Sequence, residues 1–294
     1  MAGRFGSVLS AMVTPFDAEG ELDLDAAQAL ARWMAAHGND GLVIAGTTGE
    51  APTLTDAERL DLVKAVAEAV TIPVVAGMGS NDTAHSVGLT KQAAGLGAAA
   101  VLIVGPYYSR PPQAGIEAHF RACAAATSLP VMAYDVPGRT GRRIATDVLH
   151  RLFTDVPNMV ALKDATGDPQ ASAALVATLG DGFELYSGDD GLTLPLLAIG
   201  AVGVVGVATH WVAEQMGEMI SAYEKGDVAR ARELNAAMLE SFEFANTDES
   251  NFSMSAKAMM RTLGLSVGEC RLPLPPTPPG VEDRARKVYV RLNA

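Results

Sequence analysis

Short apolar segments recur along the chain and alternate with segments of helical pattern. The apolar segments are rich in Val, Ile, Leu and Ala and show almost no polar alternation, which is typical of parallel strands buried on both faces. Helix-start signals stand between them, including the capping box Thr55-Asp56-Ala57-Glu58, the pair Asp168-Pro169 and the pair Asn81-Asp82. The pattern predicts eight strands, at 7–13, 41–45, 73–76, 99–104, 130–134, 159–162, 183–186 and 202–207.

Eight strand and helix pairs within about 220 residues predict an α/β fold, the (β/α)₈ TIM barrel. An open sheet would need a Gly-rich nucleotide turn between a strand and a helix, but the Gly-rich segment 95–100 precedes a strand. We expect residues 1–224 to form the catalytic barrel. Helix patterns at 227–244 and 253–263, followed by a Pro-rich connector at 272–279, predict a C-terminal helical domain over 225–294.

Composition removes several classes of function. The chain has 294 residues, is 49% hydrophobic and carries a formal net charge of −12 without a basic cluster, which argues against nucleic acid as a partner. Cys123 and Cys270 are its only cysteines, and the histidines lack metal-site spacing, so we expect no metal and no cofactor. Apolar stretches end well short of the ~18 residues of a membrane span, and no signal-peptide core is present at the N-terminus. We therefore expect a cytoplasmic protein that does not enter membranes.

Polar side chains gather at the predicted C-terminal ends of the strands, where such barrels build their active sites. Lys163 stands alone at the end of the sixth strand, where partial desolvation would lower the pKa of its amine and make it a nucleophile. It could attack the ketone of a 2-oxo acid to form an imine. The other polar strand ends are 46–50 after the second strand, 105–108 after the fourth and 134–141 after the fifth.

These segments supply the further groups that imine chemistry on a carboxylate needs. Thr48 and the backbone amides of the turn that begins at Gly46 could bind the substrate carboxylate. Tyr134 could move protons, with a hydroxyl chain through Thr47, and the planar fork of Arg139 could hold a second carboxylate. Each residue type also has an ordinary use in an edge charge, a turn, a helix cap or core packing.

Taken together, segments 46–50, 106–108, 134–141 and 162–167 resemble the dihydrodipicolinate synthase and N-acetylneuraminate lyase family, and the resemblance runs over nearly the whole chain. It implies a (β/α)₈ barrel with a C-terminal helical domain. It also implies that pyruvate is the first substrate and that Lys163 forms the Schiff base.

The resemblance implies roles for five further residues. Tyr134 matches the proton-transferring tyrosine, and Thr47 matches the hydroxyl that links it to a second tyrosine, Tyr108. In the family this second tyrosine reaches into the site of a neighbouring subunit, which implies at least a dimer and commonly a homotetramer. Thr48 matches the residue that binds the pyruvate carboxylate, and Val205 the one whose backbone carbonyl faces the site.

Arg139 distinguishes members of the family. The resemblance implies that an arginine here holds the carboxylate of aspartate semialdehyde, so we expect condensation of pyruvate with that aldehyde to 4-hydroxy-tetrahydrodipicolinate, in lysine and diaminopimelate biosynthesis. One alternative is a lyase for sugar acids of the 2-keto-3-deoxygluconate or N-acetylneuraminate type. Another is a pyruvate-binding sensor without catalysis, because a fold does not guarantee an activity.

The chain departs from the family pattern at several positions. Asp135 stands where asparagine is frequent, Gly105 where threonine is usual, and 253–257 replaces a segment that commonly contains Asn-Pro. Asn81 and Tyr107 match the family's regulatory lysine pocket, but His85 stands where that pocket has an acid. An imidazole cannot replace a carboxylate in binding a cation, so weak or absent inhibition by lysine is expected.

Overall fold

The strands form one closed parallel barrel, in which each strand pairs with the next along the chain and β8 returns to β1. The computed structural model describes residues 3–294. All eight predicted strands are confirmed, with shifts of a few residues at their ends. They are β1 (Val8–Ala11), β2 (Gly41–Ile44), β3 (Val74–Gly77), β4 (Ala100–Val104), β5 (Val131–Asp135), β6 (Met159–Asp164), β7 (Glu184–Ser187) and β8 (Gly203–Gly206).

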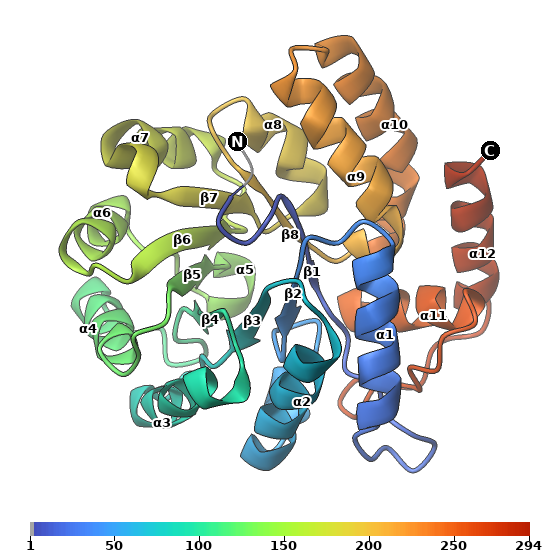
Figure 1. The fold of residues 1–294 in the computed structure, drawn as a ribbon, viewed down its shortest axis with the longest axis horizontal. Coiled ribbons are helices and arrows are strands. Elements are labelled where there is room, and N and C mark those ends of the chain that lie inside the picture. The colour runs from blue at the N-terminus through green and yellow to red at the C-terminus, as the bar shows by residue number, and fades with distance from the viewer. Residues whose placement is uncertain (1–2) are drawn as a thin grey trace.

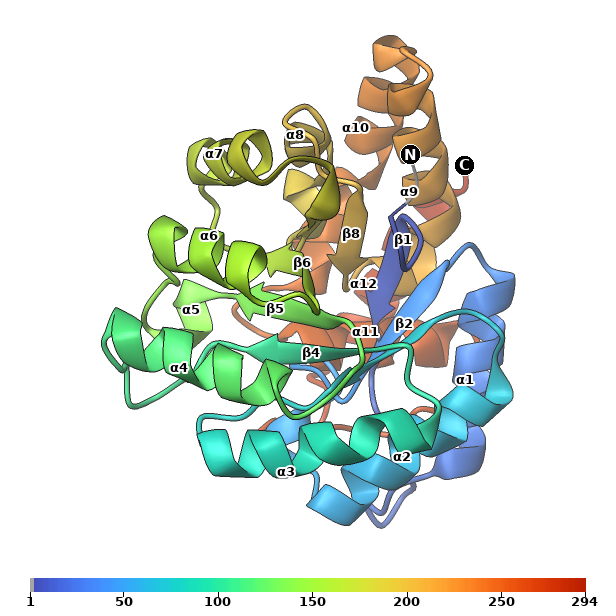
Figure 2. The same cartoon turned by 60° about the vertical axis from the view of Figure 1, so that its left-hand side comes forward.

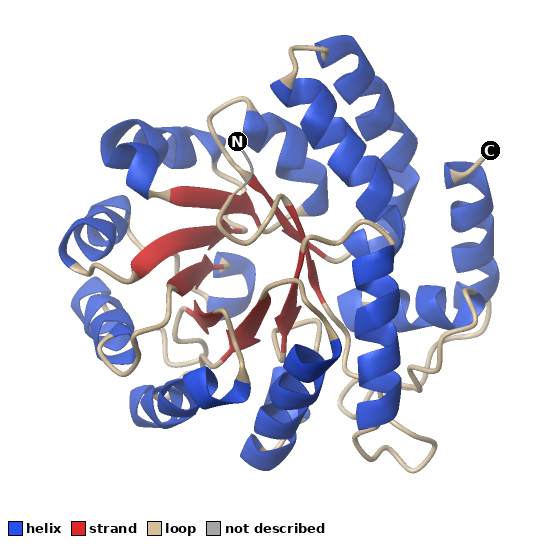
Figure 3. Ribbon diagram, viewed as in Figure 1, coloured by secondary structure: helices blue, strands red, loops and turns tan. Residues whose placement is uncertain are grey.

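Helices surround this barrel on its outer side (Figure 1 and Figure 3). The predicted starts are confirmed, because Thr55 and Glu58 form a reciprocal capping box and the side chains of Asp82 and Asp168 accept hydrogen bonds from the first turns of their helices. The helices up to the end of the barrel are α1 (Leu24–Ala36), α2 (Asp56–Ala69), α3 (Thr83–Ala93), α4 (Gln113–Ala124), α5 (Pro137–Thr140), α6 (Thr146–Asp155), α7 (Pro169–Leu179), α8 (Thr193–Leu197) and α9 (Thr209–Glu224).

Two layers of apolar side chains explain why the strand sequences lack polar alternation. The larger layer fills the space between the sheet and the helices. The smaller one lies inside the barrel and includes Leu9, Val43, Met132, Tyr134 and Val205. Both faces of every strand are therefore withdrawn from water, as is usual for parallel sheets.

The chain continues beyond the barrel as three helices, α10 (Val228–Ala245), α11 (Phe252–Thr262) and α12 (Val281–Leu292). Helix α10 packs along α9 and α12, and α11 packs against α12, so the added segment forms a group of helices beside the barrel. Figure 2 shows α9 and α10 side by side in a second view. The division into domains at 224 and 225 stays a prediction.

Candidate active site

Lys163 and Tyr134 lie side by side at the end of the barrel. They occupy neighbouring strands, β6 and β5, and are direct partners in the register of the sheet. The Lys163 side chain is buried, and its Nζ lies 4.4 Å from the centre of the Tyr134 ring. The sheet therefore places the amine of Lys163 over the ring of Tyr134, away from bulk water.

Burial makes Lys163 an unusually acidic ammonium. Loss of hydration lowers its pKa to about 8, and the nearby Arg139 lowers it too, while the carboxylate of Asp190 acts in the opposite direction. A lysine in this state gives up its proton near neutral pH and becomes a nucleophile. The desolvation expected from its position in the sequence is therefore confirmed.

Tyr134 keeps its proton. Burial raises the pKa of its hydroxyl, and this outweighs the opposing effects of the Arg139 guanidinium and of a hydrogen bond with the Thr47 side chain. A neutral phenol bonded to a second hydroxyl can donate and accept protons without carrying charge itself. The predicted pairing of Tyr134 with Thr47 is present.

The turn that holds Thr47 and Thr48 is bounded by two residues in the left-handed conformation. Ala45 has a φ of 55° and Glu50 a φ of 57°, which is uncommon outside glycine. Inside the turn the Glu50 amide donates to the Thr47 carbonyl at 3.1 Å, and the Ala51 amide donates to the carbonyl of Gly46 at 3.2 Å. Such strain persists only where neighbouring structure enforces it, and it is common at functional sites.

A cavity of about 210 Å³ opens beside these residues. Its lining includes Gly46 and Thr47 from the end of the second strand, and Tyr134 and Arg139 from the end of the fifth. The guanidinium carbon of Arg139 lies 5.2 Å from the ring centre of Phe252, the first residue of α11. Cation–π contact of this kind helps to orient an arginine that also lines the cavity.

Four of the predicted site residues lie outside that lining. Lys163 is one of them, although it is the direct neighbour of Tyr134 in the sheet. Thr48 is buried in the turn, and Val205 is buried within the barrel in the same apolar cluster as Tyr134. Tyr108 is 90% exposed and has a φ of 71°, so within one chain it does not join the site. Its neighbour Tyr107 lines the cavity instead.

Asp135, which departs from the family pattern, is a buried acid directly after Tyr134. Burial raises its pKa to about 7, and the nearby Asp164 contributes, although the amide of Ile144 donates to its Oδ2 at 3.1 Å. Its charge therefore changes near neutral pH, and its negative form raises the pKa of the Tyr134 hydroxyl.

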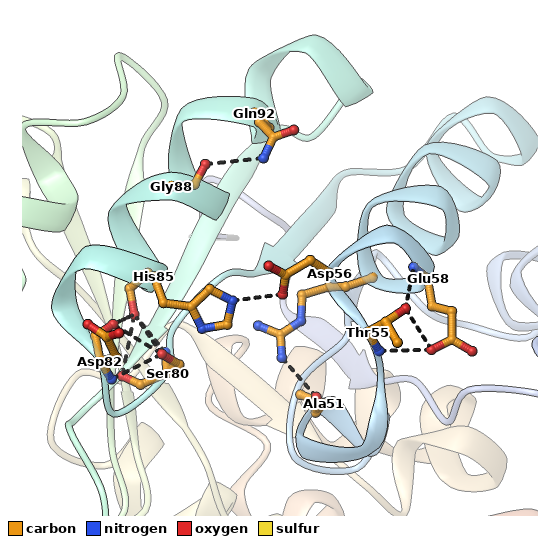
Figure 4. A network of polar contacts seen from close by, with 11 residues as sticks. Ala51, Thr55, Asp56, Glu58, Ser80, Asp82, His85, Gly88 and Gln92 are labelled. Carbon is orange, nitrogen blue, oxygen red and sulfur yellow. Dashed lines mark hydrogen bonds and ion pairs between the residues drawn. The ribbon is translucent and has the colours of Figure 1, made fainter.

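The region that matches the regulatory pocket contains an acid that the sequence pattern did not reveal. Figure 4 shows His85 of α3 facing Asp56 of α2, with His85 Nε2 2.7 Å from Asp56 Oδ1. Arg59 lines the cavity nearby, and its guanidinium donates to the Ala51 carbonyl at 2.8 Å. The carboxylate of Asp56 is thus engaged by an imidazole and lies within the field of a permanent cation.

Sequence reasoning also missed residues that act on the site from a distance. Phe252, which stacks on Arg139, and Asp190, whose carboxylate acts on Lys163, belong to none of the predicted motifs. Lys257 and Glu50 form a buried ion pair that links α11 to the turn of Thr47. The sequence did contain one signal for this pair, because Lys257 stands between two alanines.

Within residues 3–294 no group of three or more His, Cys, Asp or Glu side chains is arranged to hold a metal ion. The helices described there are also too short or too polar to cross a membrane.

The barrel and its buried lysine beside a tyrosine define a class of enzyme that forms imines with keto compounds. The chain matches the dihydrodipicolinate synthetase family over residues 4–289, and it belongs to that family.

Individual relatives agree with this assignment. The chain is 53% identical to a 4-hydroxy-tetrahydrodipicolinate synthase of Acidothermus cellulolyticus, over 92% of this chain and 87% of the relative. It is similar to a dihydrodipicolinate synthase structure from Bacillus anthracis, with a TM-score of 0.94, 40% identity and 99% of both chains covered. A lysine-bound structure from Cyanidioschyzon merolae is 41% identical, with a TM-score of 0.95 and 98% of both chains covered.

Proposed function

We propose that the protein is a Schiff-base-forming lyase that condenses pyruvate with L-aspartate 4-semialdehyde to 4-hydroxy-tetrahydrodipicolinate, a step of lysine and diaminopimelate biosynthesis. The observation that carries this proposal is the buried Lys163, with a pKa lowered to about 8, next to the neutral Tyr134 in a chain that matches the family almost from end to end. The named relatives at about half identity favour this reaction over cleavage of sugar acids.

Each residue then has a chemical task. The neutral amine of Lys163 attacks the keto carbon of pyruvate, and water leaves to give a protonated imine. Loss of a methyl proton gives an enamine, whose carbon attacks the aldehyde of the second substrate. The amino group of that substrate then attacks the imine carbon, which closes the ring and releases Lys163 as a free amine. The Tyr134 hydroxyl, relayed through Thr47, supplies and removes the protons of these steps.

Two carboxylates need separate positions. We assign the pyruvate carboxylate to Thr48 and to the backbone of the turn that starts at Gly46, with the carbonyl of Val205 on the opposite side. The carboxylate of the aldehyde is assigned to Arg139, because a guanidinium lining the cavity and packed against Phe252 can bind a carboxylate with two parallel hydrogen bonds.

The expected homotetramer and the cytoplasmic location stay predictions. The exposure of Tyr108 in a left-handed backbone conformation supports a subunit contact, because a single chain gives this large aromatic side chain no packing partner to offset the strain. In the proposed dimer the hydroxyl of Tyr108 completes the proton relay of a neighbouring subunit.

The test compares possible aldehyde substrates. Purified protein is incubated with pyruvate and aspartate semialdehyde, and separately with glyceraldehyde or N-acetylmannosamine, while pyruvate consumption is followed. We expect consumption only with aspartate semialdehyde, and none with the folded Lys163→Ala variant. Faster consumption with a sugar aldehyde would instead identify a sugar-acid lyase. A protein that gains no mass on Lys163 with pyruvate and cyanoborohydride would be a binding protein without this chemistry.

A further inference from the structure

A buried ion pair joins the helices beyond the barrel to the turn that carries Thr47 and Thr48. Lys257 of α11 and Glu50, the residue that ends the turn, lie with Nζ and Oε1 2.8 Å apart. Both side chains are buried, with exposed fractions of 0% for Lys257 and 2% for Glu50. The two residues are far apart in the sequence, so only the folded chain brings them together.

The rest of the contact fixes both partners. Lys257 Nζ also donates to the carbonyl of Glu269 at 2.8 Å and lies 4.2 Å from the ring centre of Phe16. The other oxygen of Glu50 accepts from the backbone amide of Arg271 at 2.8 Å. Both oxygens of one carboxylate are therefore held by the segment that runs from α11 to residue 271.

Arg271 extends this contact along the same stretch of chain. Its guanidinium donates to the carbonyl of Thr53 at 3.0 Å, just beyond the turn, and forms an ion pair with Glu58 in the first turn of α2. Its guanidinium carbon lies 4.2 Å from the ring centre of Phe16, the same ring that Lys257 approaches. Residues 50–58 are thus secured at several points by the C-terminal segment.

Burial of an ion pair costs hydration and is not in itself a source of stability. In this protein the ion pair matters because it fixes the position of Glu50. Glu50 adopts a left-handed conformation that a non-glycine residue does not prefer, and its amide is bonded to the Thr47 carbonyl. Contacts that fix the Glu50 side chain therefore also fix the backbone conformation of the turn, and with it the positions of Thr47 and Thr48.

We propose that the Lys257–Glu50 ion pair is the positioning device of the substrate-carboxylate turn, by which the C-terminal helices keep Thr47 and Thr48 aligned with Lys163. Neither residue of the pair lines the cavity beside Tyr134. The inference rests on the proposed function, because it assumes that this turn binds the carboxylate of pyruvate.

The test uses the pyruvate dependence of imine trapping, since this reports on the turn without the second substrate. Wild-type protein, Lys257→Met, Glu50→Gln and the double variant are treated with cyanoborohydride at a series of pyruvate concentrations, and the mass added to Lys163 is followed. We expect the half-saturating pyruvate concentration to rise about tenfold or more in Lys257→Met. The maximal trapping rate should fall less, because Lys163 itself is untouched.

The double variant and one control variant separate positioning from loss of folding. The double variant leaves no unpaired charge, and the amide oxygen introduced by Glu50→Gln can still accept from the Arg271 amide. It is therefore expected to unfold at a higher temperature than Lys257→Met while keeping weak pyruvate binding. Arg230→Met serves as the matched control, because it removes a cation of α10 whose exposed ion pair with Glu218 lies outside the site. It should leave the half-saturating concentration unchanged.

The outcomes are distinguishable from failure of the proposed function. Wild-type protein that traps no pyruvate would refute the proposed function. Wild-type trapping together with an unchanged half-saturating concentration in the folded double variant and in folded Glu50→Gln would overturn the positioning role alone. A rise in that concentration in both, with circular dichroism that matches the wild type, would support it.

Discussion

The pH dependence of imine formation follows directly from the burial of Lys163. A pKa of about 8 leaves about 9% of the amine uncharged at pH 7, whereas the ordinary value of 10.5 would leave about 0.03%, a difference of roughly 300-fold. The difference between the two pKa values corresponds to ~3 kcal/mol of differential stabilisation between the two protonation states. Burial of the amine, opposed only in part by Asp190, therefore supplies most of its reactivity at neutral pH.

The assay measures the initial rate of pyruvate trapping on Lys163 by cyanoborohydride at saturating pyruvate, between about pH 6 and about pH 10. The rate should rise with pH and level off with a midpoint near 8, after correction for the pH dependence of the reagent. The exposed Lys225, followed in the same digests, serves as the surface lysine with which the Lys163 profile is compared. A rate that still climbs steeply above about pH 9 would refute the argument, because it would mean that the amine is hydrated like any surface lysine.

Three other predictions address the second substrate, regulation and stability. Arg139→Ala should raise the KM for aspartate semialdehyde about 10- to 100-fold and leave pyruvate trapping intact; a loss of trapping would contradict the assigned role. Submillimolar lysine should inhibit weakly or not at all, because His85 stands at the acid position and Asp56 already bonds to it, and strong inhibition in a steady-state assay would show this to be wrong. Burial raises the pKa of Asp135 to about 7, so the folded state retains a proton that the unfolded carboxyl releases near ~3.9, and the free energy of unfolding should fall as the pH rises from about 4 to about 7. Thermal unfolding of Asp135→Asn at about pH 5 and about pH 8 should lack this part of the decline, and an identical pH profile in both proteins would contradict it.

The barrel could be predicted from the sequence because its strands obey one simple physical rule. A parallel strand covered by helices on one side and packed into a barrel on the other has no face to show to water, so segments such as Val74–Gly77 and Ala100–Val104 are apolar throughout. The same topology brings every strand end to one mouth. Lys163, Tyr134 and Arg139 could thus be grouped from the sequence alone, as could the turn of Thr47.

What the sequence could not give depends on contacts between distant parts of the chain. Arg139 and Phe252 meet only because α11 packs near the end of the barrel where Arg139 lies. No local sequence pattern predicts that packing. His85 and Asp56 likewise face each other across two helices. A charged residue within a helix normally indicates a face exposed to solvent. The helix pattern of 253–263 therefore did not predict that Lys257 is fully buried.

The two buried lysines of this protein show how environment separates a nucleophile from a structural charge. Both lie close above an aromatic ring, at 4.4 Å for Lys163 and 4.2 Å for Lys257, and burial lowers the pKa of both. Lys257, however, has a carboxylate at 2.8 Å and a carbonyl at 2.8 Å, which favour its charged form and occupy its protons. Among the described residues Lys163 has no such ion pair, only the more distant field of Asp190. The amine of Lys163 is therefore the one that can lose its proton and attack a carbonyl carbon. The paired Lys257 stays charged and, as proposed above, holds the turn in place.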